Sequence, residues 1–243
     1  MNAATVPSGK GELTLYCLPY AGGAASVYYG WADGLPPWVR IAPILLPGRD
    51  GMPGTPPRSV RALARAAAEQ ILPQRDKPFA LFGYSMGALV AYELSVLLQR
   101  EFATAPRLLL VAAHPPPHQP REASRLHTLQ DEDFVRHLVA ARVLPAELTS
   151  NAELLASALP LLRADATAVE TYRFHATARL DCPVTVISGR DDPLAPPAQA
   201  PHWADLTTRA VACRTIVGDH FFVRSHRPSL LCVLAAELEL VHP

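Results

Sequence analysis

A five-residue segment, GYSMG at residues 83–87, constrains the fold of this 243-residue chain more than any other feature. It follows a short apolar run at residues 79–82 and precedes a stretch, residues 86–92, that would be apolar on nearly every side of a helix. The two glycines allow a sharp turn between a buried strand and a buried helix, in which the serine side chain is exposed. A GxSxG segment without such neighbours is often an ordinary glycine-rich turn. In this context it predicts a nucleophile elbow with Ser85 at its tip.

Short apolar, β-prone runs recur along the chain between helical patterns. They cover residues 13–18, 39–45, 79–82, 108–111, 184–188 and 213–217. Continuous apolar runs separated by helices are typical of a parallel sheet covered on both faces. One surface helix is predicted over residues 59–72, because its apolar residues share a stripe opposite its arginines. The length favours one domain, so we expect residues 1–243 to form a single α/β unit with a mostly parallel sheet.

The strand signal stops between residues 114 and 182. Helical patterns replace it over residues 131–142, 151–163 and 165–175. An insertion between late strands of an α/β sheet lies over the carboxyl ends of the strands, where ligands bind in such folds. We therefore expect a helical lid over about residues 114–182.

A serine hydroxyl becomes a good nucleophile only when a base removes its proton, so a histidine and an acid are needed. In folds with this elbow, the chain order is serine, acid, histidine. The strand predicted at residues 184–188 leads into Asp191 and Asp192, and the next predicted strand leads into His220. All these loops leave the sheet at the same edge. The order predicts a serine hydrolase of the α/β-hydrolase fold, with Ser85, Asp192 and His220 as its catalytic triad.

Other residues compete for two of these positions. Asp191 is the alternative acid, and either aspartate could instead form a turn beside the following proline. Asp192 is favoured because the acid of related loops usually stands three residues after the glycine, here Gly189. His114 follows a strand that comes too early to supply the base. His226 lies in a charged stretch, where we expect it to be solvated.

Acyl transfer also requires two backbone N–H groups that hold the negative oxygen of the tetrahedral intermediate. The amide of Met86, directly after the nucleophile, is the first expected donor. The loop LPYAGG at residues 18–23 follows the first predicted strand, and Ala21 is the expected second donor. The glycines of this loop form a tight turn under either interpretation.

Composition limits the partners and the environment of the chain. Its 22 basic and 22 acidic residues cancel, so net charge favours neither nucleic acid nor an anionic membrane. No signal-peptide core and no apolar run of the roughly 18 residues of a membrane span is found, so we expect a cytoplasmic protein. The cysteines show no zinc spacing, and no metal or other cofactor is indicated. We expect four buried, reduced thiols, at Cys17, Cys182, Cys213 and Cys232.

With these residues identified, the sequence resembles the type II thioesterases of polyketide and nonribosomal peptide assembly lines. The resemblance covers about residues 13–222. Its more specific segments are LPYAGG at residues 18–23, LPGR at residues 46–49 and LPLLRAD at residues 159–165, beside more widely shared segments at residues 83–94, 189–193 and 218–222. The chain departs from the family pattern at Tyr20, where a histidine is frequent, and at residues 112–114 and 140–145.

The resemblance implies hydrolysis of acyl groups from the phosphopantetheine arm of an acyl carrier or peptidyl carrier protein, through an acyl-enzyme on Ser85. We expect a monomer. Two alternatives stay open: an esterase or acyltransferase that uses another acceptor, and a silent hydrolase fold that only binds acyl carriers. For docking an acidic carrier, the row of Arg58, Arg61 and Arg65 is a candidate, although such a row is more often a solvated surface.

Overall fold

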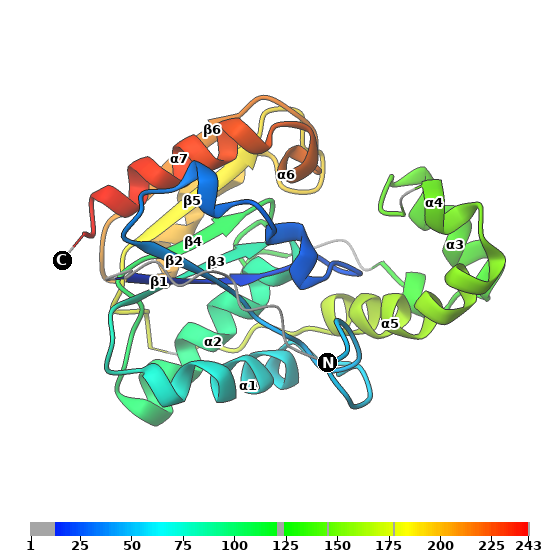
Figure 1. Ribbon diagram of the computed structural model, residues 1–243, viewed down its shortest axis with the longest axis horizontal. Coiled ribbons are helices and arrows are strands. Elements are labelled where there is room, and N and C mark those ends of the chain that lie inside the picture. The colour runs from blue at the N-terminus through cyan, green and yellow to red at the C-terminus, as the bar shows by residue number, and fades with distance from the viewer. Residues whose placement is uncertain (1–12, 121–123, 145, 177, 243) are drawn as a thin grey trace.

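The computed structural model describes residues 13–120, 124–144, 146–176 and 178–242, and its centre is a parallel sheet (Figure 1). The strands are β1 (Leu13–Leu18), β2 (Val39–Pro43), β3 (Phe79–Tyr84), β4 (Leu109–Ala112), β5 (Val184–Gly189) and β6 (Val211–Ile216). Their order in the sheet is β2-β1-β3-β4-β5-β6, and each neighbouring pair runs parallel. The predicted sheet is confirmed, with strand ends that differ from the prediction by at most two residues.

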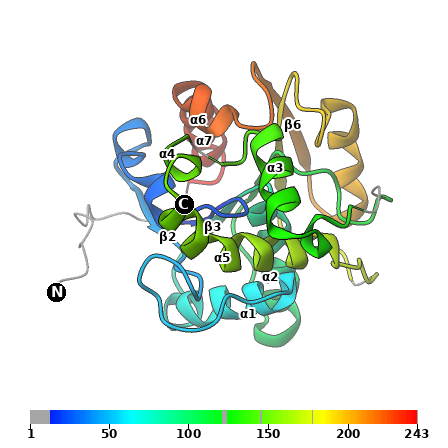
Figure 2. The same ribbon diagram turned by 90° about the vertical axis from the view of Figure 1, so that its right-hand side faces the viewer.

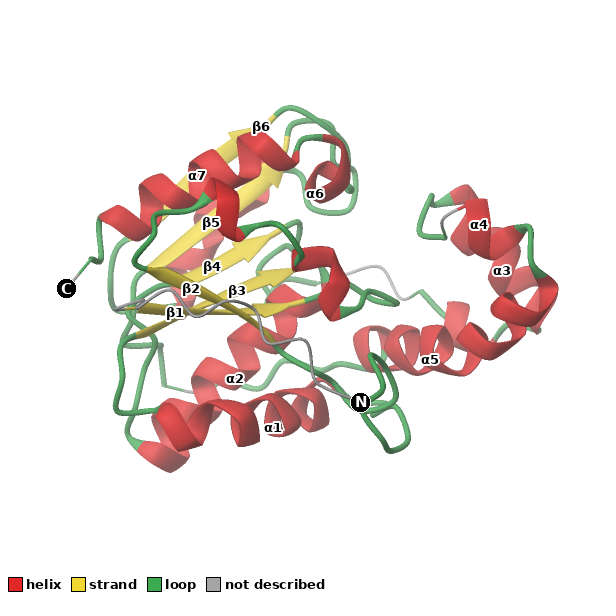
Figure 3. Cartoon of the chain, in the orientation of Figure 1, coloured by secondary structure: helices red, strands yellow, loops and turns green. Residues whose placement is uncertain are grey.

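Helices cover both faces of this sheet, as expected for parallel strands joined by crossovers. The helices are α1 (Val60–Ile71), α2 (Met86–Phe102), α3 (Asp131–Ala140), α4 (Ala146–Thr149), α5 (Ala152–Glu170), α6 (Phe222–Ser225) and α7 (Arg227–Glu239). Short 3-10 helices are η1 (Ala25–Tyr28), η2 (Ala32–Gly34), η3 (Leu72–Gln74), η4 (Leu126–Thr128) and η5 (Pro197–Leu206). Helices α1 and α2 lie on one face and α7 on the other (Figure 3).

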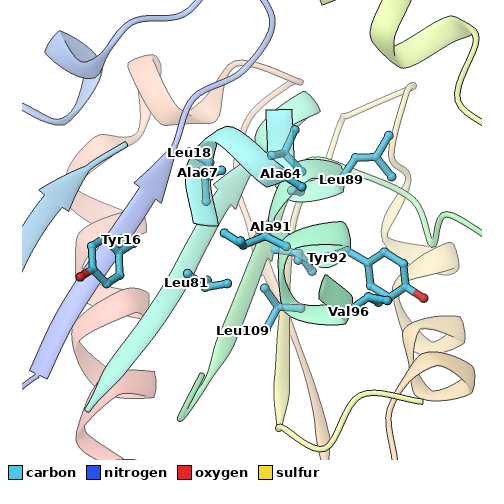
Figure 4. Packing of buried hydrophobic residues seen from close by; sticks show 14 of the residues in the cluster. Tyr16, Leu18, Ala64, Ala67, Leu81, Leu89, Ala91, Tyr92, Val96 and Leu109 are labelled. Carbon is cyan, nitrogen blue, oxygen red and sulfur yellow. The ribbon is translucent and has the colours of Figure 1, made fainter. Parts of the chain in front are cut away.

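Alternating strand residues build a hydrophobic core on each face of the sheet. Leu81 of β3 packs in the cluster that α1 and α2 cover, whereas its neighbour Phe82 belongs to the cluster under α7. Figure 4 shows Leu81 and Leu109 of the sheet beside Ala91 of α2. Helix α2 is buried on nearly all sides over residues 86–92, as its composition predicted. The central elements of the fold are therefore fixed by apolar burial.

The segment between β4 and β5 carries α3, α4 and α5 beyond the carboxyl ends of the strands (Figure 2). It has a small hydrophobic cluster of its own, made of Phe134, Leu138, Leu144 and Leu162. The prediction of two helices over residues 151–163 and 165–175 was wrong, because α5 is continuous and ends at Glu170. Its buried face runs through the expected break, and the exposed Pro160 does not end the helix.

All four cysteines are free thiols, but the expectation that all are buried was wrong. Cys17 and Cys182 are buried, whereas Cys213 and Cys232 are exposed. Cys213 lies in β6, an edge strand whose middle residues face solvent, and Cys232 lies on the outer side of α7. Apolar neighbours in the sequence did not predict burial there, because an edge strand and a surface helix each bury only one of their own sides. Within the described residues, no helix has the length and apolar character needed to cross a membrane.

Replacing Leu89 in α2 by alanine should lower the free energy of unfolding by about 2–5 kcal/mol, because this fully buried leucine would leave a cavity. The control is Leu154→Ala in α5, since Leu154 is 51% exposed and its loss should cost less than about 0.5 kcal/mol. Urea unfolding followed by circular dichroism measures both. Equal losses in the two variants would contradict the assigned core.

Candidate active site

Ser85 lies at a strained turn between β3 and α2. Its backbone angles are φ 53° and ψ −116°, a conformation that few non-glycine residues adopt. The flanking glycines are needed for space, because a Cβ at Gly83 would lie 2.2 Å from the Gly87 carbonyl oxygen. A Cβ at Gly87 would lie 2.1 Å from the carbonyl oxygen of Leu18. The turn therefore has the close backbone packing that the elbow prediction required.

The three residues predicted as a triad lie in hydrogen-bond contact. The Oγ of Ser85 is 3.0 Å from Nε2 of His220, and Nδ1 of His220 is 2.8 Å from Oδ2 of Asp192. A carboxylate only accepts hydrogen bonds, so the imidazole proton belongs on Nδ1 and Nε2 is left to accept from the serine. The other carboxylate oxygen of Asp192 accepts from the amides of Leu194 and Ala195, at 2.9 and 3.1 Å. Asp192 is thus fully engaged and its orientation is fixed.

The competing residues have other surroundings. Asp191 is exposed, whereas the side chain of Asp192 is fully buried against His220. His114 is buried, and its Nδ1 lies 2.6 Å from the carbonyl oxygen of Pro115. His226 is half-buried rather than solvated, and its Nδ1 contacts the hydroxyl of Ser225 at 2.8 Å. The geometry therefore favours the residues that the strand order selected.

Tyr84, the residue before Ser85, anchors the loop that carries His220. Its hydroxyl donates to the backbone oxygen of His220 at 2.7 Å and accepts from the amide of Val223 at 3.3 Å. Burial raises the pKa of Tyr84, so its hydroxyl stays protonated and able to donate. Sequence reasoning assigned no role to this residue. The available signal was a large polar aromatic in the buried strand position next to the serine.

The two predicted oxyanion donors leave the sheet together. Leu18 of β1 pairs with Gly83 of β3, and Ala21 and Met86 each lie three residues further along. Within the described part of the chain, neither amide has a protein acceptor. Two N–H groups without an acceptor, at the sheet edge that carries Ser85, fit the oxyanion site predicted from the sequence.

The turn that contains Ala21 is closed by a hydrogen bond from the Gly23 amide to the Tyr20 oxygen, at 2.8 Å. Gly22 has φ +74°, which suits the third position of a type II turn. The Tyr20 ring packs edge-on against Tyr84 and Phe221, with centroids 6.1 and 5.9 Å away. The tyrosine that replaces the frequent histidine therefore forms part of the aromatic wall beside the turn.

A buried ion pair lies behind this turn. Asp165 of α5 contacts Arg49 through two hydrogen bonds, of 2.7 and 3.0 Å, and their side chains are 0% and 2% exposed. Asp165 also accepts from the amide of Gly22 at 2.7 Å, and Arg49 donates to the Gly23 oxygen at 3.1 Å. Burial raises the pKa of the Asp165 carboxyl, while the guanidinium and the amide oppose that rise. The segments at residues 46–49 and 159–165, which only the family resemblance singled out, are thus in contact through this ion pair.

The arginine row predicted as a docking face has acidic partners. Arg61 pairs with Glu93 at 3.3 Å, and Arg65 pairs with Glu101 at 3.0 Å, both across α1 and α2. Arg58 is exposed. The face therefore alternates in charge, and it is less basic than the arginines alone suggested.

Comparisons with known proteins found a matching family model, similar sequences and similar structures. A family model described as a thioesterase domain matches residues 13–238. The gramicidin S biosynthesis protein GrsT of Aneurinibacillus migulanus is 31% identical over 95% of this chain and 90% of its own. RedJ, a thioesterase from the prodiginine pathway of Streptomyces coelicolor, has a TM-score of 0.85 at 34% identity, over 97% of this chain and 91% of its own. The type II thioesterase BorB from the borrelidin biosynthetic cluster has a TM-score of 0.86 at 32% identity, over 96% and 95%.

Replacing Asp192 by asparagine should lower kcat on the order of 10³- to 10⁴-fold, because an amide no longer holds the imidazole in the tautomer that accepts the serine proton. The matched control is Asp191→Asn, which should turn over at the wild-type rate since Asp191 is exposed. Steady-state hydrolysis of a small acyl thioester measures both. Loss of activity in the control alone would move the acid to Asp191.

Proposed function

The chain belongs to the thioesterase family of the α/β-hydrolase fold, and from this membership and the site geometry we propose that it hydrolyses acyl groups from the phosphopantetheine arm of carrier proteins in nonribosomal peptide or polyketide pathways. The observation that carries this function is the chain of contacts from Ser85 through His220 to Asp192. These residues act as the catalytic triad. A thioester needs only a nucleophile, a base and an oxyanion site, and the described residues offer all three.

In the first half-reaction, Nε2 of His220 takes the hydroxyl proton of Ser85 while Oγ attacks the thioester carbonyl carbon. The amides of Ala21 and Met86 hold the resulting oxyanion. Asp192 stabilises the imidazolium that has formed. When the intermediate collapses, the carbon–sulfur bond breaks, the imidazolium proton goes to the departing thiolate, and the acyl group remains on Ser85.

In the second half-reaction, water replaces the thiol. His220 takes a proton from the water as its oxygen attacks the acyl carbon, and the same two amides hold the oxyanion. Collapse breaks the bond to Ser85, whose Oγ regains the proton. The products are the free acid and, from the first step, a carrier arm with a free thiol.

The segment of about residues 114–182 acts in this proposal as a lid over the acyl group, inserted into a single domain of residues 1–243. Within the described residues, its polar contacts with the His220 side are few and exposed: Arg142 lies 3.7 Å from Asp219, and Arg224 donates to the Val143 oxygen at 3.4 Å. Exposed pairs at these distances contribute little stability, so this edge can separate and admit an acyl arm.

Removing the Ser85 hydroxyl should abolish acyl release. The expected loss for Ser85→Ala is on the order of 10⁴- to 10⁶-fold in turnover. Intact-mass analysis of acyl-loaded carrier protein, incubated with wild type and variant, follows both the carrier and the enzyme. The wild type should free the carrier thiol and show an acyl adduct, and the variant should do neither. Acyl release at the wild-type rate by the variant would exclude Ser85 as the nucleophile.

Carrier-bound acyl groups should be better substrates than the same acyl group on a small thiol, because the carrier adds contacts outside the site. Measuring kcat/KM for both forms at low and high ionic strength tests this, and an advantage that weakens with salt indicates that charge steers the encounter. Equal values for the two forms would favour an esterase or small-thioester hydrolase.

A further inference from the structure

Helix α5 reaches the turn of residues 20–23, named here the oxyanion turn, with a charged side chain, Asp165, as well as with an apolar one. Asp165 is a helix residue with no exposed surface, and its carboxylate oxygens accept three hydrogen bonds, all from outside α5. One comes from the Gly22 amide and two come from Arg49. Burying such a pair contributes little net stability compared with apolar residues of similar volume. The ion pair therefore calls for a reason beyond holding α5 in place.

The hydrogen bonds fix the peptide groups around Ala21. The Ala21 amide belongs to the same peptide unit as the Tyr20 oxygen, and this oxygen accepts from the Gly23 amide at 2.8 Å. The described peptide bonds are trans, so the Ala21 N–H points to the opposite side, away from the turn. The next peptide unit carries the Gly22 N–H, which Asp165 binds at 2.7 Å. Types I and II of this turn differ by a flip of that central unit, and the bond to Asp165 opposes the flip.

Other contacts from the same two segments hold the rest of the loop. Arg49 binds the Gly23 oxygen at 3.1 Å, and Asp50 accepts from the Ala25 amide at 2.8 Å. Leu162, one turn before Asp165 in α5, packs on Gly22 so closely that a Cβ there would lie 2.5 Å from its Cδ2. The turn is thus held on one side by the cap helix and on the other by the loop after β2.

We propose that Asp165 and Arg49 are positioning residues that hold the turn of residues 20–23, the oxyanion turn, in its working conformation, with the Ala21 amide as an oxyanion donor. The inference deepens the proposed function, since it names what sets the second oxyanion donor. It concerns the carbonyl oxygen of any acyl substrate, whatever thiol carries that acyl group.

The test uses the full chain with a small acyl thioester and with a trifluoromethyl ketone, which forms a hemiketal with the serine whose oxygen needs the oxyanion donors. Asp165→Asn keeps one acceptor oxygen but loses the charge and the paired geometry for Arg49. It should lower kcat about 100-fold and weaken binding of the ketone by a similar factor, with KM nearly unchanged. The control is Asp131→Asn, which removes the exposed cap ion pair with Arg163 and should leave both values at the wild-type level.

A folded Asp165→Asn enzyme with wild-type kcat would overturn the proposal. So would a fall in kcat with unchanged binding of the ketone, because the defect would then lie outside the oxyanion site. Should Asp165→Asn fail to fold, the double variant Arg49→Met with Asp165→Leu removes both charges and leaves neither unpaired. It should fold and show the same loss of about 100-fold in both kcat and ketone affinity. Full activity in this variant would refute the proposal.

The proposal that carrier-bound acyl groups are the substrates is tested separately. If wild-type enzyme hydrolyses the small thioester but leaves the carrier-bound acyl group intact, carrier proteins are excluded as substrates. The role of Asp165 and Arg49 would still be decided by the small thioester and the ketone.

Discussion

The contact between the first turn of α2 and the end of β1 is the constraint on which the rest of the site depends. Backbone meets backbone there, because any side chain at Gly87 would collide with the Leu18 carbonyl oxygen. The helix start that carries Met86 and the strand end that leads to Ala21 therefore cannot shift independently. The strained conformation of Ser85 persists because its surroundings determine it on both sides. Ser85 and the two amides that we propose as oxyanion donors are in this way fixed by backbone packing.

The proposed lid, residues 114–182, contacts this rigid centre at two edges of different character. On the α5 side, Asp165 and Arg49 are buried and bonded to the oxyanion turn. On the α3 side, the contacts of Arg142 and Val143 with the loop and helix after β6 are exposed and long. Buried charged pairs resist separation far more than exposed ones do. In the proposed function, the α3 edge of the lid therefore opens, while the α5 edge stays bonded to the turn of residues 20–23.

The sequence predicted most of the sheet and the main site geometry, because these depend on local patterns. A GxSxG segment between an apolar run and an apolar helix rarely forms anything but a nucleophile elbow. The strand order then selected His220. What could not be predicted depends on contacts between distant residues. Asp165 and Arg49 lie 116 residues apart, and no local pattern pairs them. The exposure of Cys213 follows from β6 being an edge strand, which only the assembled sheet reveals.

The separate hydrophobic cluster of the cap has a consequence for how such an enzyme diverges. Phe134, Leu138 and Leu144 pack with one another and with Leu162, apart from the two clusters that cover the sheet. Substitutions among the first three can change the packing inside the proposed lid without moving a strand. Leu162 also contacts Gly22, so its side chain must fit both the lid cluster and the turn of residues 20–23. Changes in the packing of the proposed lid can therefore accumulate at three of these positions and are restrained at the fourth.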